Sequence, residues 1–275
     1  EGLEKLNQLL KKKFNVGHLL LVGQYSPESN PGFPIKFFDM QRNIFCSEIN
    51  CVQDSVEFLD ISALKVIKTC LLLLREDTPC LLEIYHIDYQ PSKTCTLLRE
   101  DGLGTVAEVF NTLHFHKIES QELLKDVESQ VMAQLTTWDK LKLVIPKLAP
   151  EDIVIDEKFN FKIRTLSTGV PMDLDLDLAN LNCDHMVQNL LAGLKGPEER
   201  SFTELSPKLL RIFILEEMIW NNFASASEES ETMLIEKLVI SMFRLISNLY
   251  EELGDISEAA SWSARIFKIF PKSYD

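Results

Sequence analysis

The sequence predicts an α+β protein in which an antiparallel β-rich region at residues 1–101 is followed by an α-helical region at residues 105–275. Two observations support this division. Short apolar segments separated by turn residues dominate the first part, which is typical of strands. After residue 104 the apolar residues recur at helical spacing instead. With 275 residues, the chain is long enough for the two domains that we expect.

The β-rich region is expected to form a meander preceded by a short helix at residues 2–12. Turn signals separate the strands, first among the Pro, Ser, Asn and Gly residues of 26–33 and later at residues 77–79 and 90–92. Alternating apolar and polar residues at 83–89 indicate a half-exposed strand. The predicted strands are residues 17–25, 34–40, 43–50, 66–75, 79–89 and 94–99.

An internal similarity links two stretches of this region. Residues 34–40 begin with Pro34 and lead to Cys46, while residues 79–85 begin with Pro79 and lead to Cys95. Each stretch follows a run of apolar residues, and the prolines are 45 positions apart (79 − 34). Self-similarity at such a period is typical of units that stack because none can bury its apolar face alone.

Three helices are predicted from local signals. One begins near Ser120 and carries an apolar stripe through Val127 and Val131. A second begins at Ser206 and Pro207, which suit the N-cap and first helical position, and runs to about residue 222. After a Ser/Glu-rich loop at residues 224–231, a long apolar stripe reaches Leu249.

The last helix is expected to follow Gly254, because Asp255 and Glu258 have capping-box spacing and Pro271 ends the pattern. Three prolines break the chain between residues 142 and 182, so this segment is predicted to be irregular, with a strand at 159–163 as an alternative.

Composition and charge exclude several classes of protein. The formal net charge is −14, and residues 11–13 are the one basic run, so nucleic-acid binding by this chain is not expected. No stretch of eighteen apolar residues is present, so we expect no membrane span. The six cysteines lack C-x-x-C spacing and look like buried apolar residues. We expect an intracellular protein of the cytoplasm or nucleus.

The sequence contains no complete motif for catalysis, cofactor binding or metal binding. Asp173, Asp175 and Asp177 match the first three ligands of a calcium loop, but Leu178 stands where that loop requires glycine. The preferred interpretation of these aspartates is an alternating exposed segment, or a short linear motif that a partner protein binds through strand addition. No nucleophile elbow, Walker loop or kinase signature occurs. We therefore expect no catalytic, cofactor-binding or metal-binding residues.

Two weaker signals, for zinc and for a nucleotide, are also present in the sequence. His114 and His116, with His185 and Cys183, have ligand chemistry for zinc, but nothing in the sequence brings them together. The pair of glycines at 102 and 104 lacks the third glycine of a nucleotide-binding loop and suggests a hinge between the halves.

The last thirty-five residues or so resemble one tetratricopeptide repeat. Ser247, Ser263 and Ile266 depart from that pattern, where the repeat has a small glycine, an aromatic residue and an alanine. A generic helical hairpin fits the same residues. The positions that match are Phe243, Ile246, Tyr250, Gly254, Asp255, Ala259 and Pro271.

The β-rich region resembles two blades of a WD-like propeller. Residues 18–24 are similar to an inner strand and residues 35–40 to the following strand, while residues 83–87 keep the form without its aspartate–tryptophan ending. Two blades cannot close a propeller. Three alternatives stay open: earlier blades precede Glu1 in a longer protein, a partner completes the sheet, or the region is a small barrel or sandwich by itself.

Taken together, the two resemblances are to β-propeller plus α-solenoid scaffold proteins of vesicle coats, nuclear pores, tethers and checkpoint complexes. They imply a non-enzymatic scaffold or adaptor subunit whose partners are other protein subunits. An enzyme of an unrecognised family and a nucleic-acid-binding factor with a small β-barrel are the alternatives. The candidate partner-binding residues are Trp138, Trp220, Trp262, Phe213 and Phe223, with core packing as their alternative role, and Asp173, Asp175 and Asp177.

Overall fold

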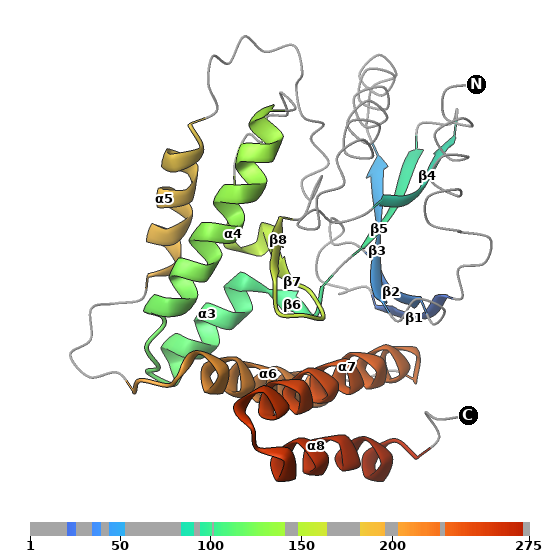
Figure 1. Ribbon diagram of the computed structural model, residues 1–275. Helices are drawn as coiled ribbons and strands as arrows, with labels where there is room; N and C mark the ends of the chain where they lie inside the picture. Colours follow the sequence, from blue (N-terminus) through green and yellow to red (C-terminus); the bar gives the residue numbers. More distant parts are fainter. Residues whose placement is uncertain are drawn as a thin grey trace.

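The structure of the chain is a computed structural model (Figure 1). A five-stranded N-terminal sheet and a mainly helical part meet along the long helix α7, Glu229–Leu253. For the N-terminal strands, the backbone pairing is described and the side chains are not. The residues that the structure describes are 21–25, 35–39, 44–52, 84–90, 94–100, 102–140, 148–163, 182–195, 203–225 and 229–271.

The N-terminal strands form one five-stranded antiparallel sheet in the order β1-β2-β3-β5-β4. Strands of the two similar stretches belong to this same sheet, since β3 pairs with β5 with Cys51 opposite Cys95. The predicted helix at 2–12 and strand at 66–75 lie outside the described residues, and the propeller resemblance stays a prediction. The strands are β1 Leu21–Tyr25, β2 Ile35–Asp39, β3 Ile44–Val52, β4 Ile84–Gln90 and β5 Thr94–Glu100.

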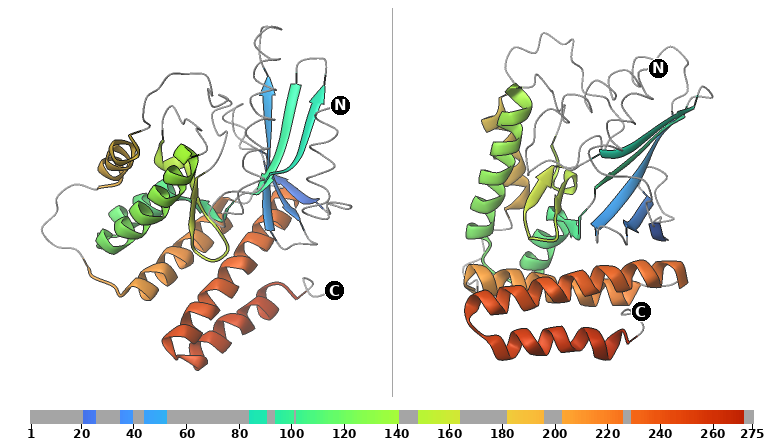
Figure 2. Two further views of the ribbon diagram at one scale, coloured as in Figure 1. Left: turned by 45° about the horizontal axis from the view of Figure 1, so that its top comes forward. Right: turned by 45° about the vertical axis from the view of Figure 1, so that its right-hand side comes forward.

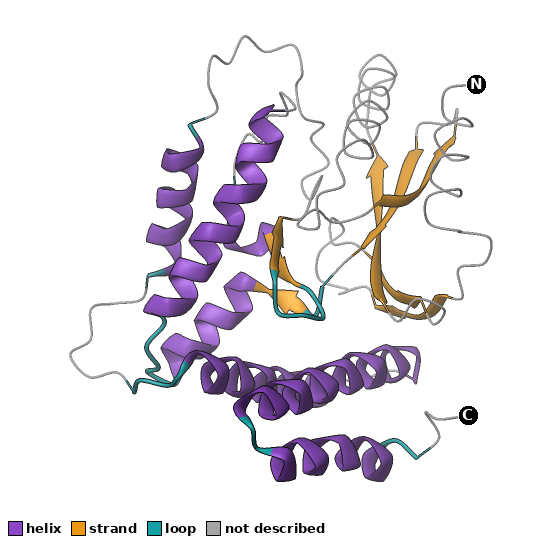
Figure 3. Ribbon diagram, viewed as in Figure 1, coloured by secondary structure: helices purple, strands orange, loops and turns teal. Residues whose placement is uncertain are grey.

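A second, smaller antiparallel sheet lies among the helices (Figure 3), with strand order β6-β7-β8. Its strands are β6 Gly104–Thr105, β7 Ile153–Ile155 and β8 Phe161–Ile163. The prediction that residues 142–182 are irregular is therefore wrong for 150–163, where the 3-10 helix η1, Pro150–Asp152, leads into β7. Every residue of β7 and β8 is buried, and this burial in the core favours the strands.

The glycines predicted as a hinge are instead sites of close packing. Gly104 lies in β6, and the Leu103 amide next to it donates to the Ile155 carbonyl at 2.7 Å. A Cβ at Gly102 would overlap that same carbonyl oxygen. The absence of a side chain therefore lets this segment approach β7.

Helix α3, Val106–Phe115, begins at a capping box. The Thr105 hydroxyl accepts from the Glu108 amide, and the Glu108 carboxylate accepts from the Thr105 amide at 2.7 Å. These two bonds satisfy two amides that the first turn of a helix leaves without partners. The buried residues Val106, Val109, Phe110 and Leu113 then face the core at helical spacing.

Helix α4, Gln121–Lys140, covers the edge of the small sheet with glutamine side chains. Gln134 is fully buried; its amide nitrogen donates to the Phe161 carbonyl, and its oxygen accepts from the Ile163 amide, both at 2.7 Å. Gln130 accepts from the Phe161 amide at 2.8 Å. The edge of β8 is thus hydrogen-bonded to a helix, which satisfies backbone groups that would otherwise be buried without partners.

The hairpin between β7 and β8 is organised by Asp156. Its Oδ1 accepts from the amides of Lys158 and Asn160, and Phe159 between them has a positive φ of 63°. The Lys162 ammonium lies 3.6 Å from the same carboxylate, and both side chains are almost fully buried. Asp156 therefore fixes the turn and neutralises a buried cation.

Helix α5, Cys183–Leu194, packs on α4, and the Asn182 side chain caps it by accepting from the His185 amide. The three C-terminal helices are α6 Pro207–Ser225, α7 Glu229–Leu253 and α8 Ile256–Ile269. Figure 2 shows α7 lying between the N-terminal sheet and α8, in agreement with its contacts to β1 and to α8.

The starts predicted from local signals are confirmed for α6 at Pro207 and for α8, where the Asp255 carboxylate accepts from the Glu258 amide. Between α7 and α8, two residues that depart from the tetratricopeptide pattern contact each other. The Ser247 hydroxyl donates to the Ala259 carbonyl at 2.8 Å and lies 2.9 Å from the Ser263 hydroxyl. These serines join the two helices where they cross.

Candidate protein-interaction site

The predicted partner-binding residues occupy very different places. Trp138 and Trp262 are 2% and 6% exposed and belong to the core, so as placed they are not interface anchors. Trp220 is 69% exposed, and Phe213 is half-buried beside the core. Phe223 lies in α6, but its side chain is outside the described part, as are Asp173, Asp175 and Asp177 altogether.

One face of α6 carries exposed apolar side chains. Leu209, Phe213, Glu217 and Trp220 are spaced by four, four and three positions, which places them on the same side of a helix. Leu209 is 42% exposed, so the apolar surface extends from the first turn of α6 toward its end. Two residues chosen from the sequence, Phe213 and Trp220, are thus brought onto one surface.

The end of α3 adds two rings to this surface. The His116 ring lies edge-to-face against Phe213, with centroids 5.2 Å apart, and against Phe115 at 5.0 Å. Its Nε2 atom is 3.0 Å from the Glu217 carboxylate, which fixes the ring against α6. We call Phe115, His116, Phe213 and Trp220 the aromatic face.

Phe115 was missed by the sequence reasoning, although it is 81% exposed. The bounds of α3 and its buried stripe are the information that would have identified this residue as exposed. The buried stripe of that helix ends at Leu113, and Phe115 lies two positions further, about 200° around the helix axis. A large aromatic side chain on the side opposite the stripe must point away from the core.

The neighbourhood of the aromatic face is acidic. Glu216 lies next to Glu217 on α6, and burial raises the pKa of its carboxyl group above the usual value, while Arg265 of α8 lowers it. Burial also raises the pKa of the Tyr250 hydroxyl on α7, with a further contribution from the charge of Glu216. The main cause of both shifts is the partial shielding of these two groups from water between α6, α7 and α8.

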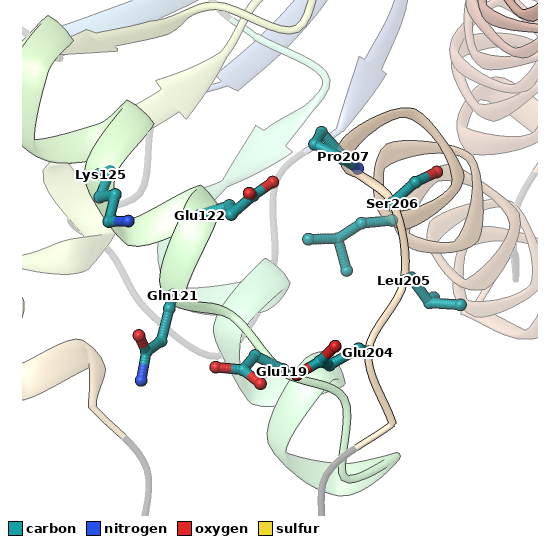
Figure 4. Close-up of a pocket in the computed structure, with 9 residues that line it drawn as sticks. Glu119, Gln121, Glu122, Lys125, Glu204, Leu205, Ser206 and Pro207 are labelled. Carbon is teal, nitrogen blue, oxygen red and sulfur yellow. The ribbon is translucent and has the colours of Figure 1, made fainter.

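A groove of about 510 Å³ opens beside α6, between the first turns of α4 and α6 (Figure 4). A short parallel bridge at its base pairs Ile118 with Thr203, and the Glu119 amide donates to the Thr203 carbonyl at 3.0 Å. Beyond this bridge the two segments separate into their helices. The residues lining this α4–α6 groove are Glu119, Gln121, Glu122, Lys125, Glu204, Leu205, Ser206, Pro207 and Leu210.

The candidate zinc ligands do not converge in the described part of the chain, where no group of three or more His, Cys, Asp or Glu side chains is placed to hold a metal ion. His116 instead contacts α6, while Cys183 and His185 lie at the start of α5. Burial raises the pKa of the Cys183 thiol, which keeps it in the less reactive protonated form.

Among the helices that the structure describes, none combines the length and apolar character needed to cross a bilayer. Comparison with family models and with curated proteins found no match to the chain. The site must therefore be interpreted from its own geometry.

Proposed function

We propose that this protein is a non-enzymatic scaffold or adaptor that binds another protein subunit through the aromatic face. The exposure of Trp220 is the observation that carries the proposal. Tryptophan, tyrosine and arginine dominate the energetics of protein interfaces, whereas most other contacts contribute little. A tryptophan that is 69% exposed on a helix otherwise buried along its other side is a ready anchor for a partner.

The size of this contribution follows from the exposed area. Aromatic side chains bury about 150–250 Å² each, so covering about 150 Å² of Trp220 would contribute about 4 kcal/mol at ~25 cal/mol per Å². Phe115 adds a second exposed ring, which contacts the His116 ring, and His116 in turn contacts Phe213 on α6. Prior ordering of these rings lowers the entropy cost of binding.

The proposal keeps the role implied by the resemblance to propeller-and-solenoid scaffolds, in which helices and strands both serve protein contacts. The helical architecture of α6, α7 and α8 is compatible with such a role, and the acidic residues around the aromatic face disfavour nucleic acid as its partner. The same proposal includes that the partner is another protein subunit and that the protein acts inside the cell.

The test uses a photo-crosslinking amino acid placed in the full chain inside cells. Incorporation at Phe115 is expected to give a discrete adduct with one partner protein, and Trp220→Ser should strongly reduce that adduct because it removes the anchor. Incorporation at Ser261, an exposed position on α8, is the matched control. Equal adducts at Phe115 and Ser261, or an adduct insensitive to Trp220→Ser, would contradict the proposal.

A further inference from the structure

The α4–α6 groove has the size and lining of a binding site separate from the aromatic face. Its volume of about 510 Å³ falls within the range of about 300–1,000 Å³ for ligand sites. Leu210, only 3% exposed, is an apolar part of its lining, together with Leu205 and the exposed Pro207. An apolar side chain entering the groove would therefore leave water and contact carbon atoms.

The polar part of the lining is acidic. Figure 4 shows Glu119 and Glu204 at the same end of the groove, one from each of the two segments, and Glu122 above them on α4. Lys125 is the single cation among the lining residues. The three carboxylates have no ion-pair partner within the described part of the chain.

Two helix N-termini also line this groove, and their partial positive charges oppose the negative charge of the carboxylates. The first residues of α4 and α6, Gln121 and Pro207, both line it. A helix N-terminus is equivalent to roughly +0.5 of a charge, so the two together offset about one carboxylate. With Lys125 offsetting another, a net charge of about −1 remains, which favours a cationic guest.

Cations elsewhere on α6 are already engaged. The Arg211 guanidinium lies 2.9 Å from the Asp126 carboxylate, and the Lys208 ammonium lies 3.2 Å from the Glu252 carboxylate. Both side chains are thereby held toward other groups, and neither lines the groove. Its negative charge is thus available to an external ligand.

We propose that the α4–α6 groove docks a basic peptide segment of a protein partner. A lysine or arginine side chain of that segment lies beside Glu119 and Glu204, and a neighbouring apolar side chain contacts Leu205 and Pro207. This inference goes beyond the proposed function, because the aromatic face and the groove are built from different residues and bind independently.

The probe is a fluorescein-labelled peptide of eight residues, in which two arginines alternate with two leucines between Gly/Ser flanks. Fluorescence anisotropy with the full chain is expected to show saturable binding in the micromolar range that weakens as salt concentration rises. A peptide with glutamates in place of the arginines should bind at least tenfold more weakly. Equal binding of the two peptides would overturn the proposal.

Variants that remove carboxylates test whether the peptide binds in the α4–α6 groove. Glu119→Gln combined with Glu204→Gln should weaken binding of the arginine peptide about tenfold, because two charged contacts to the arginines are lost. The control pair Glu251→Gln and Asp184→Asn removes the same charge from exposed positions elsewhere and should leave binding unchanged. An equal loss in both pairs would show non-specific attraction to an acidic chain and would overturn the proposal.

Two further measurements separate the alternatives. Displacement of the peptide by millimolar inorganic phosphate at constant ionic strength would show that the helix N-termini select an anion and would overturn the proposal. Trp220→Ser should leave peptide affinity unchanged, so failure of the aromatic face and failure of the groove are distinguishable. Circular dichroism of every variant should match the unmodified chain, which links any lost affinity to the groove itself.

Discussion

Replacing Gln134 by methionine tests how much the glutamine-bound edge of β8 contributes to stability. Methionine keeps the unbranched shape of the side chain but cannot hydrogen-bond to the Phe161 carbonyl and the Ile163 amide. Each buried backbone group without a partner costs about 1–3 kcal/mol, and two such groups give about 2–6 kcal/mol. Part of this cost is offset because the buried amide of glutamine is also removed. We expect a loss of about 3 kcal/mol in the free energy of unfolding.

Urea unfolding monitored by tryptophan fluorescence and circular dichroism measures the change. The buried Trp138 and Trp262 report the core, and the transition midpoint should fall while the slope with denaturant stays the same. The matched control is Gln188→Met on the exposed surface of α5, which removes only a solvent-exposed hydrogen bond to Glu128 and should change stability by no more than about 0.5 kcal/mol. If Gln134→Met is as stable as this control, the side-chain bonds to β8 do not support the sheet.

Two other predictions concern the C-terminal helices. Ser247→Ala should lower the free energy of unfolding by about 1 kcal/mol, because the α7–α8 crossing loses the bond to the Ala259 carbonyl; the exposed Ser261→Ala is the control. Glu216→Gln should stabilise the protein at pH 7. The raised pKa of Glu216 means that the folded state penalises its ionised form, and this penalty grows as pH rises through the window between the unfolded and folded pKa. Unfolding curves at pH 7 and pH 4 should therefore show a gain at pH 7 that disappears at pH 4, and a gain of equal size at both would refute this cause.

Local chemistry was sufficient to predict where several helices begin. Proline cannot donate an amide bond and suits the first helical position, so Pro207 marks the start of α6. Asp255 caps α8 through a bond to a residue only three positions away. Signals of this kind are legible in the sequence because both partners lie within one turn of each other.

The small sheet shows why other elements could not be predicted. Strand β7 is three residues long, and Val154 pairs with Thr105, which lies 49 positions earlier (154 − 105). So short a strand has almost no pattern of its own. Its stability depends on burial and on pairing with distant residues, and neither quantity is present in a local window of sequence.

For the candidate site, too, one part of the description follows from the sequence and another part only from the tertiary structure. The sequence by itself determined that the chain has large aromatic residues on amphipathic helices, an acidic balance and no complete catalytic motif. Only the tertiary structure decided that Trp138 and Trp262 are covered while Trp220 is exposed, and that Phe115 joins Phe213 through His116. The physical reason is that periodicity identifies the apolar sides of a helix, whereas contacts between distant segments determine which side is withdrawn from water.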